Sequence, residues 1–390
     1  MRSIEEHRQV IRAELSPRET ERVRLEAARG RVLARDISAE WDSPRFANSQ
    51  MDGYAVAHPA AGARVVGPTI AAGADPAQLY PDGVGDLAAP IMTGAALPVG
   101  AQCIIPVEKA QPARFLGEGE EVVLPESSVG AFVRAQGNDI AAGELLLRAG
   151  TALTPAGVAA IASQSIAQVE VYQRARLLVV TGGAEISSSA EHPAQIPDAN
   201  GPMIAAAAER YCMEVAGHVR TNDNPDVLRA DLQSAVDALC PDVIVTSGGI
   251  SAGAFEVVRQ VLDGPHAWFG HVGMQPGGPQ GIARFAGCPV ICLPGNPVST
   301  LVSFRLFVAP LLGRTPAERS AHVVADQRGL EGKDQLLRGR LDYAGAQVSV
   351  SVVGGAGSHL ITQAVDADCL LRVPRQAELK AGDLVTVYPL

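Results

Sequence analysis

The segment Asp242–Gly253, DVIVTSGGISAG, is the strongest indication of the fold class, because in it an apolar run passes directly into a glycine-rich turn. The segment Cys292–Thr300, CLPGNPVST, repeats this arrangement. In both segments the apolar run is typical of a buried strand, and the residues after the turn are typical of a helix. Strands that alternate with helices in this way predict a mostly parallel sheet, whose ligands bind beyond the carboxyl ends of the strands.

A third strand, Arg176–Val180, also runs into glycines, so three glycine-rich turns are expected at one edge of the sheet: 181–185, 247–253 and 294–297. Glycine lets the backbone approach a ligand closely, and free amides at the start of a helix favour an anion such as phosphate. The turn at 247–253 fits neither GxGxxG nor GxxxxGKS/T, so it carries no nucleotide fingerprint. One such turn alone is explained equally well as a phosphate site or as a plain tight connection. Two such turns on neighbouring strands favour a shared anionic ligand.

The rest of the chain predicts a multidomain α/β-plus-β subunit. Proline, glycine and short β-branched runs alternate in one long stretch, which predicts an inserted β-rich domain. Helices are expected at 3–15, 20–28 and 151–163, and strands of a final β domain at 347–353, 359–363, 369–373 and 384–388. The expected domains are 1–35 with 138–173 (helical/linker), 36–137 (inserted, β-rich), 174–318 (α/β) and 319–390 (small, β).

Composition excludes several classes of protein. The 390 residues carry a formal net charge of −10, which argues against an electrostatic grip on nucleic acid. No run of about 18 apolar residues suggests a membrane span, and the charged start of the chain lacks a signal-peptide core, so a cytoplasmic location is expected. Six cysteines are scattered without a CxxC pair, which favours buried thiols over a zinc site.

Three polar segments lie in the first 140 residues, and local pattern alone gives them no chemistry. Asp52 begins an Asp-Gly turn in NSQMDGYAV, and Thr93-Gly94 is a similar case in Met92–Gly100. Arg134 and Asp139, in VRAQGNDI, can be explained as a solvated pair. The histidines do not cluster, and no Ser/His/Asp arrangement can be argued from spacing.

Six segments taken together resemble the molybdopterin molybdenumtransferase family, which includes the gephyrin E domain, over nearly the whole chain. These segments are SQMDGYAV (49–56), IMTGAALPVGAQCIIPVE (91–108), VRAQGNDI (133–140), IPDANGPMI (196–204), TSGGISAG (246–253) and CLPGNPVST (292–300). The resemblance implies that the protein inserts molybdate into adenylylated molybdopterin and releases AMP. It also implies an elongated homodimer of four-domain subunits, with the α/β domain of one subunit facing the β-rich domain of the other.

The resemblance, and not the local pattern, assigns the site residues. It implies catalytic roles for Asp52, Asp223 and Glu256, and Mg²⁺ held by Asp139 and Glu185. The implied substrate-binding residues are Thr93, Gly94, Asp198, Asn200, Ser247, Gly248, Gly249, Ser251, Gly253, Pro294, Gly295, Asn296 and Pro297. The implied partners are a second copy of the chain and the molybdopterin adenylyltransferase that supplies the substrate.

The sequence also departs from the family pattern. Ala184 stands where the family has an acidic residue, Glu256 replaces a shorter aspartate, and Gln275 and Gly278 replace two lysines that would hold an oxyanion. Arg284, six residues beyond Gly278, is a candidate to replace the lost charge. The departures leave open a degenerate paralogue that binds molybdopterin as a scaffold or carrier without catalysing insertion. A nucleotide-dependent hydrolase has no Walker-type lysine to support it.

Overall fold

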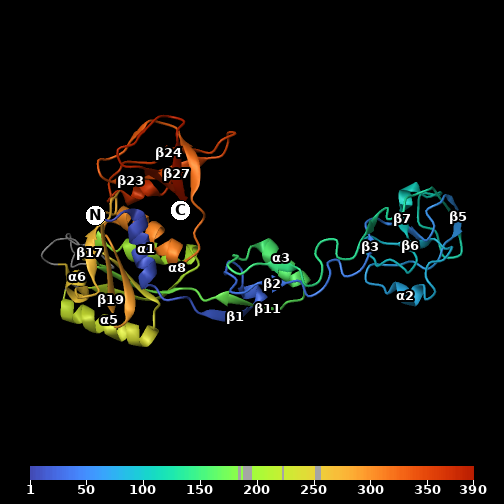
Figure 1. The fold of residues 1–390 in the computed structure, drawn as a ribbon, viewed down its shortest axis with the longest axis horizontal. Helices are drawn as coiled ribbons and strands as arrows, with labels where there is room; N and C mark the ends of the chain where they lie inside the picture. The colour runs from blue at the N-terminus through green and yellow to red at the C-terminus, as the bar shows by residue number, and fades with distance from the viewer. Residues whose placement is uncertain (183–185, 188–195, 222–223, 251–255) are drawn as a thin grey trace. The chain divides into compact units, whose positions relative to one another are not determined.

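The computed structural model describes residues 1–182, 186–187, 196–221, 224–250 and 256–390 (Figure 1). It consists of two compact units: the first joins Met1–Glu19 to Gln173–Leu390, and the second is the continuous stretch Thr20–Tyr172. The chain crosses between the units twice, and the crossings lie side by side, because Thr20 pairs with Tyr172. The second unit is therefore an insertion behind the first helix. The finer division into four domains stays an expectation from the sequence.

The first unit is built on a six-stranded mixed sheet. Four strands are parallel neighbours, β19 pairs with the last of them in the antiparallel sense, and β17 pairs antiparallel with β19. In spatial order the strands are β15 (Glu214–Thr221), β12 (Arg176–Gly182), β16 (Val243–Ser247), β20 (Cys288–Leu293), β19 (Pro279–Phe285) and β17 (Trp268–His271). The predicted α/β sheet is confirmed, while its two antiparallel pairings, β20–β19 and β19–β17, were not predicted from the sequence.

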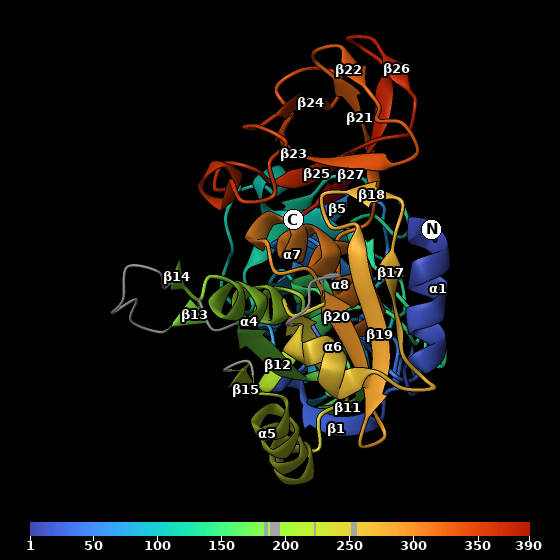
Figure 2. The ribbon, with the colours of Figure 1, turned by 90° about the vertical axis from the view of Figure 1, so that its left-hand side faces the viewer.

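Helices cover both faces of this sheet (Figure 2). On one face, Leu177 and Val179 of the sheet share an apolar core with three helical elements. On the other face, the intervening Leu178 and Val180 share a second core with two helices. The first set is α1 (Ile4–Glu14), α4 (Asn200–Arg210) and the continuous run α7 (Pro297–Ser303), π-helical η3 (Phe304–Val308) and α8 (Ala309–Leu312). The second set is α5 (Pro225–Leu239) and α6 (Val257–Leu262). This two-sided burial explains the continuous apolar runs of the central strands.

Helix α1 carries a fully buried histidine. Ser3 and Glu6 form a capping box at the start of the helix. One turn further along, the buried ring of His7 packs against the rings of Trp268 and Phe307, whose centroids lie 5.3 and 4.8 Å from its own. Neither ring nitrogen has a hydrogen-bond partner in the described part of the chain. Burial, with the nearby charge of Arg2, lowers the pKa of His7 to about 3, so the ring is neutral at ordinary pH.

The C-terminal region is a closed β-barrel that packs on the α1 face of the sheet through Leu336, Leu370 and Tyr388. Its ring of strands, in order, is β23 (Asp334–Asp342), β24 (Ser349–Val352), β21 (Arg319–Val323), β27 (Leu384–Pro389) and β25 (Cys369–Val373), which pairs with β23 again. Smaller elements are β18 (Met274–Gln275) beside β23, the pair β22 (Gln327–Arg328) and β26 (Glu378–Leu379), and η4 (Ile361–Ala364). The strand predicted at 359–363 is wrong, because this stretch holds the 3₁₀ turn η4.

The second unit begins and ends in a strand pair. The helix predicted at 20–28 is wrong: Thr20–Arg24 is strand β1, which pairs with β11 (Gln168–Tyr172), and only Leu25–Ala27 turns, as the 3₁₀ helix η1. Exposed and half-buried residues alternate along β1, which is the period of a strand. The helix expected at 151–163 is present as α3 (Pro155–Ser163), with Thr154 as its N-cap.

The β-rich character expected for the inserted region is confirmed by short paired strands. These are β2 (Ile37–Ser38) with β10 (Leu145–Leu147), β3 (Asn48–Ser49) with β9 (Val133–Arg134), β5 (Gly62–Val65) with β8 (Glu121–Leu124), and β4 (Gly53–Val56) between β6 (Ala89–Ile91) and β7 (Cys103–Pro106). The remaining elements are α2 (Pro76–Leu79) and η2 (Val107–Lys109) here, and the pair β13 (Ile186–Ser187) and β14 (Ile196–Pro197) in the first unit. Among the described residues, no helix has the length and apolar character to cross a bilayer.

Candidate functional site

Three glycine-containing turns meet at the carboxyl edge of the large sheet. Strands β12, β16 and β20 are parallel neighbours, with Thr181 beside Ser247 and Ser247 beside Leu293. At their ends lie glycines or a proline-glycine pair: Gly182, Gly248-Gly249 and Pro294-Gly295. The structure therefore brings together the beginnings of the three predicted glycine-rich segments, while residues 183–185 and 251–253 of these segments lie outside the described part of the chain.

The absence of side chains lets these turns touch one another. Gly248 has φ +96°, and a Cβ built on it would lie 3.3 Å from the carbonyl oxygen of Gly182 and 3.7 Å from the Cα of Gly295. A Cβ built on Gly295 would lie 3.2 Å from the Cα of Gly248. Any larger residue would push the strands' ends apart or require a strained backbone. The edge thus offers backbone atoms, and not side chains, to a ligand.

Hydroxyl groups behind the turns hold them in place. Thr300 Oγ1 donates to the carbonyl oxygen of Pro294 at 2.7 Å, and Ser247 Oγ lies 3.2 Å from the same oxygen and 3.0 Å from Thr300 Oγ1. Gly248 N–H donates to the carbonyl oxygen of Leu293 at 3.1 Å. Ser247 is only 4% exposed, so its hydroxyl braces the neighbouring turn from behind. Thr300 was not predicted from the sequence; its signal is a hydroxyl four residues beyond Asn296.

The start of α4 contacts the same edge. Asn200 Nδ2 donates to the carbonyl oxygen of Gly295 at 2.7 Å, and Gly201 N–H donates to Asp198 Oδ1 at 2.9 Å. The Asp198 side chain is 4% exposed. Although burial opposes it, the hydrogen bonds from Gly201 and Thr181 and the charges of His218 and Arg220 lower the pKa of Asp198. Asn200 therefore contacts the turn at Gly295, whereas Asp198 faces into the protein; their role in binding substrate stays a prediction.

A second cluster lies in the inserted unit and is built around Asp52. The amide and the hydroxyl of Thr93 donate to Asp52 Oδ1 at 2.7 and 2.8 Å, and these two bonds lower the pKa of Asp52. Gly94 has φ +81° and donates its N–H to the carbonyl oxygen of Ser49, which closes the turn. Gly53 is required here because a Cβ would collide with the carbonyl oxygen of Ile105 on β7. Asp52 stays exposed, and its Oδ2 has no protein partner among the described residues.

The remaining predicted carboxylates do not join these clusters in the described part of the chain. Asp139 is exposed and accepts a long bond, 3.4 Å, from Ser43 Oγ. Glu256 is the N-cap residue of α6, without a side-chain capping bond. No group of three or more His, Cys, Asp and Glu side chains that could hold a metal is found among the described residues. The predicted Glu185, Asp223, Ser251 and Gly253, together with Ala184, lie outside those residues.

The lysine-free turn Gln275–Pro279 also reaches the sheet edge. This turn leads into β19, where Gly281 pairs with Cys292 of β20. Because the two strands are antiparallel, the last residue of the turn lies beside the carboxyl end of β20. Buried Gln280 binds it from behind, donating to the carbonyl oxygen of Gly277 and to Ser303 Oγ, both at 2.7 Å. The turn is therefore built into the edge without a positive charge.

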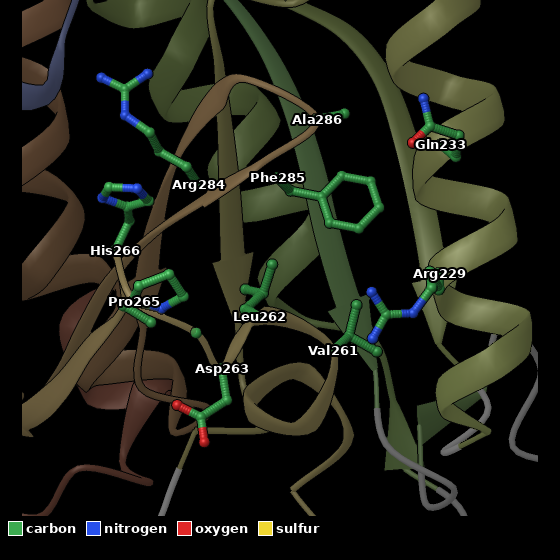
Figure 3. Close-up of a pocket in the computed structure, with 12 residues that line it drawn as sticks. Arg229, Gln233, Val261, Leu262, Asp263, Pro265, His266, Arg284, Phe285 and Ala286 are labelled. Atoms are coloured by element: carbon green, nitrogen blue, oxygen red, sulfur yellow. The ribbon is translucent and has the colours of Figure 1, made fainter.

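Arg284 does not replace that charge. Its guanidinium binds the Glu14 carboxylate at 2.9 Å and the carbonyl oxygens of Glu14 and Gly287. It lines a cavity of about 350 Å³ with Arg229, Phe285 and His266 (Figure 3). This cavity adjoins the hairpin that enters β20 and thus lies at the edge of the sheet opposite to the glycine turns.

Comparison with known proteins covers almost the whole chain. Three family models match in order: the MoeA N-terminal region (domains I and II) over residues 2–165, a probable molybdopterin binding domain over 178–314, and the MoeA C-terminal region (domain IV) over 325–390. Molybdopterin molybdenumtransferase 2 of Mycobacterium tuberculosis is 36% identical over 417 residues, which cover all of both chains. The molybdopterin molybdenumtransferase of Haemophilus influenzae is 29% identical and covers 96% of this chain and 94% of its own.

Solved structures share the fold. A molybdopterin biosynthesis MoeA protein from Pyrococcus horikoshii superimposes with a TM-score of 0.76 at 28% identity, covering 99% of this chain and 98% of its own. A second structure of that name from the same organism gives a TM-score of 0.81 at 22% identity over the full length of both chains.

Proposed function

This chain belongs to the MoeA family of molybdopterin molybdenumtransferases, which act in molybdenum cofactor biosynthesis, and we propose that it inserts molybdate into adenylylated molybdopterin with release of AMP. The observation that carries this proposal is the meeting of Gly182, Gly248 and Gly295 at the carboxyl edge of the sheet. That edge is where sheets of this class bind ligands, and its bare backbone suits a phosphate-bearing molecule.

In the proposed reaction the two dithiolene thiols bond to molybdenum while one molybdate oxygen leaves as water with the two thiol protons. A second water adds to the phosphoanhydride, so that its P–O bond breaks and AMP leaves. The turns at 247–249 and 294–297 bind the pterin's phosphate side through backbone groups. Asp52 is the carboxylate placed to orient water or hold charge, because its Oδ1 is fixed by Thr93 while Oδ2 remains available. The depressed pKa keeps this group ionised at neutral pH.

The described residues fit Mg²⁺ only as a cation that is shared with the substrate. They hold no cluster of three protein ligands, but Mg²⁺ is commonly bound by one or two carboxylates together with substrate phosphates. The donors that the resemblance implies are Asp139, which is exposed, and Glu185, which lies outside the described residues; Asp52 is a further exposed carboxylate that can share such a cation with the substrate. When bound, the cation neutralises phosphate charge and makes the anhydride easier to cleave.

The deciding experiment incubates the purified full chain with adenylylated molybdopterin, molybdate and Mg²⁺, and measures AMP release by chromatography and cofactor by reconstitution of a cofactor-free molybdoenzyme. We expect both products to appear together and to depend on molybdate. Asp52→Asn serves as the matched inactive variant. Absence of turnover at any molybdate concentration would contradict the proposal.

The second candidate is a non-catalytic carrier of molybdopterin. It is favoured by one observation: the turn Gln275–Pro279 lies at the sheet edge without a charged side chain, and Arg284 is committed to Glu14. A carrier would bind molybdopterin with unchanged affinity in Asp52→Asn and release no AMP in the wild type. For an enzyme, we expect Gly278→Lys to raise activity at low molybdate.

The expected assembly is a homodimer, and the expected supplier of substrate is the molybdopterin adenylyltransferase, in the cytoplasm. The resemblance to the family supports all three. Light scattering at micromolar concentration tests the dimer, because a monomer would contradict it. Co-purification with the adenylyltransferase tests the expected supplier of substrate, and cell fractionation tests the expected location in the cytoplasm.

A further inference from the structure

Three polar side chains form a hydrogen-bonded chain behind the glycine turns. Thr181 Oγ1, at the end of β12, lies 2.7 Å from Asp198 Oδ2 and 2.6 Å from His218 Nε2 of β15. Thr181 is 2% exposed and the Asp198 side chain 4%, so these two lie inside the protein, whereas the His218 side chain is 28% exposed and reaches the surface.

The direction of each bond follows from the donors available. Ionised Asp198 only accepts, so Thr181, with one hydroxyl proton, donates to it. The hydroxyl oxygen then accepts from His218, which requires the proton of the ring to sit on Nε2. The one other charged group near Asp198 in the described residues is Arg220, whose Nε lies 3.6 Å from Oδ2.

The second oxygen of Asp198 fixes the start of α4. Oδ1 accepts from Gly201 N–H at 2.9 Å, whereas the N-cap residue Ala199 has no side chain that can do so. Gly201 lies so close that a Cβ there would be 2.6 Å from His218 Cε1 and 2.7 Å from Asp198 Oδ2. With both oxygens engaged from inside the protein, Asp198 is occupied by its own backbone and side-chain neighbours.

Asn200 carries this anchoring to the ligand edge. Asn200 is the first residue of α4 and directly precedes Gly201. Its Nδ2 donates to the carbonyl oxygen of Gly295 at 2.7 Å. A shift of the first turn of α4 would therefore move Asn200 away from Gly295 and remove this bond to the turn at 294–297. The hydroxyls of Thr300 and Ser247 hold the turn at Pro294 and not at Gly295.

We propose that Thr181, Asp198 and His218 form a positioning triad that sets the start of α4, so that Asn200 holds the Gly295 turn in its ligand-binding conformation. This inference rests on the proposed function for what the turn binds, but the triad itself is a statement about the free protein. It assigns Asp198 an indirect role, through Asn200, in place of contact with the substrate.

The test compares Thr181→Val, which removes the hydroxyl at nearly constant volume, with Thr181→Ser, which keeps it. We expect Thr181→Val to speed hydrogen exchange of the Gly201 amide and to raise the Kd for adenylylated molybdopterin on the order of tenfold, with kcat changed less than the Kd. Thr181→Ser should restore both. Equal losses in the two variants, or wild-type exchange and affinity in Thr181→Val, would overturn the triad.

A second pair guards against a variant that fails to fold. His218→Gln keeps a donor near the position of Nε2, whereas His218→Leu does not, so only the leucine variant should show faster Gly201 exchange. In the wild type, ¹⁵N spectra should show His218 as the Nε2-protonated form, and the opposite tautomer would refute the assignment. These readouts need no turnover: a wild type that binds no molybdopterin would defeat the proposed function and leave the triad to be judged by exchange and tautomer alone.

Discussion

The glycine edge of the sheet and the Asp52–Thr93 pair present their functional groups in opposite ways. At the sheet edge the polar side chains, Ser247 and Thr300, are buried behind the turns and only brace the backbone. In the inserted unit an exposed carboxylate is held by the amide and hydroxyl of one residue. The proposed binding at the sheet edge therefore depends on backbone shape, which one added Cβ would disturb, whereas the carboxylate's charge can be removed with little effect on the fold.

The largest expected effect comes from adding a side chain at the sheet edge. Gly248→Val places methyl groups between Gly182 and Gly295 and forces a β-branched residue to φ +96°. We expect the affinity for molybdopterin, measured by calorimetry, to fall on the order of a hundredfold or more. Gly264→Val is the matched control, because a Cβ there has nothing within 4 Å. Unchanged affinity in Gly248→Val would remove this turn from the site.

Next in size is the loss of the exposed carboxylate. Asp52→Asn should lower kcat on the order of a hundredfold while leaving the melting temperature near that of the wild type. Asp42→Asn is the control, since Asp42 is a half-exposed carboxylate of the same unit and accepts bonds from Ala142 N–H and Gln136. If the two variants have the same kcat, Asp52 has no role in the reaction.

The third prediction separates the two units by acid stability. In the unfolded chain His7 binds a proton below pH 6.5, but in the folded chain its pKa is about 3, so the unfolded state gains protons first and stability falls as pH falls between these values. The slope is up to about 1.4 kcal/mol per pH unit, which gives about 1.6 kcal/mol between pH 6.5 and 5.

Hydrogen exchange on the full chain at pH 7 and pH 5 measures this difference. Amides of the sheet unit should lose protection at pH 5, and those of the inserted unit should not. His7→Leu should remove the loss, because it replaces an unpartnered buried ring with an apolar side chain. Equal losses in wild type and variant would show that other groups cause the acid sensitivity.

The smallest effect is expected at Thr93. Thr93→Val removes the hydroxyl donor to Asp52, so the pKa of Asp52 should rise and the acid limb of the pH–rate profile should move to higher pH by less than about one unit. Thr93→Ser should leave the limb in place. A shift toward lower pH would contradict the assignment of Asp52 as an ionised group.

The sheet and its turns were predictable because apolar runs and glycines mark them locally. The helix expected at 20–28 failed because β1 takes its conformation from pairing with β11, about 150 residues later in the chain. Strands β17 and β19 were missed for a related reason: glycine and proline weaken their local signal, and their neighbours in the sheet supply the pairing.

The candidate site divides in the same way. The glycine turns could be found from pattern alone, but Asp52, Asp198 and Asn200 stood out only through the resemblance to a family. Thr181 and His218 carried no signal, because their contact depends on β12 and β15 lying side by side. Spacing in the sequence cannot reveal a hydrogen bond that exists only after the sheet has formed.

The position of α1 has a consequence for the order of events during synthesis. In the sequence, the whole inserted unit follows the helix and precedes the strands of the sheet that the helix covers. His7 contacts Phe307, which is translated 300 residues later. At about 5–20 residues per second a ribosome needs about 15–60 s to make that stretch. The helix emerges first and waits with its apolar side uncovered, while the continuous stretch Thr20–Tyr172 has all its own strands available to pair. In a growing polypeptide the insertion is thus complete before the part of the chain that surrounds it, and the earliest helix is among the last elements to reach its place.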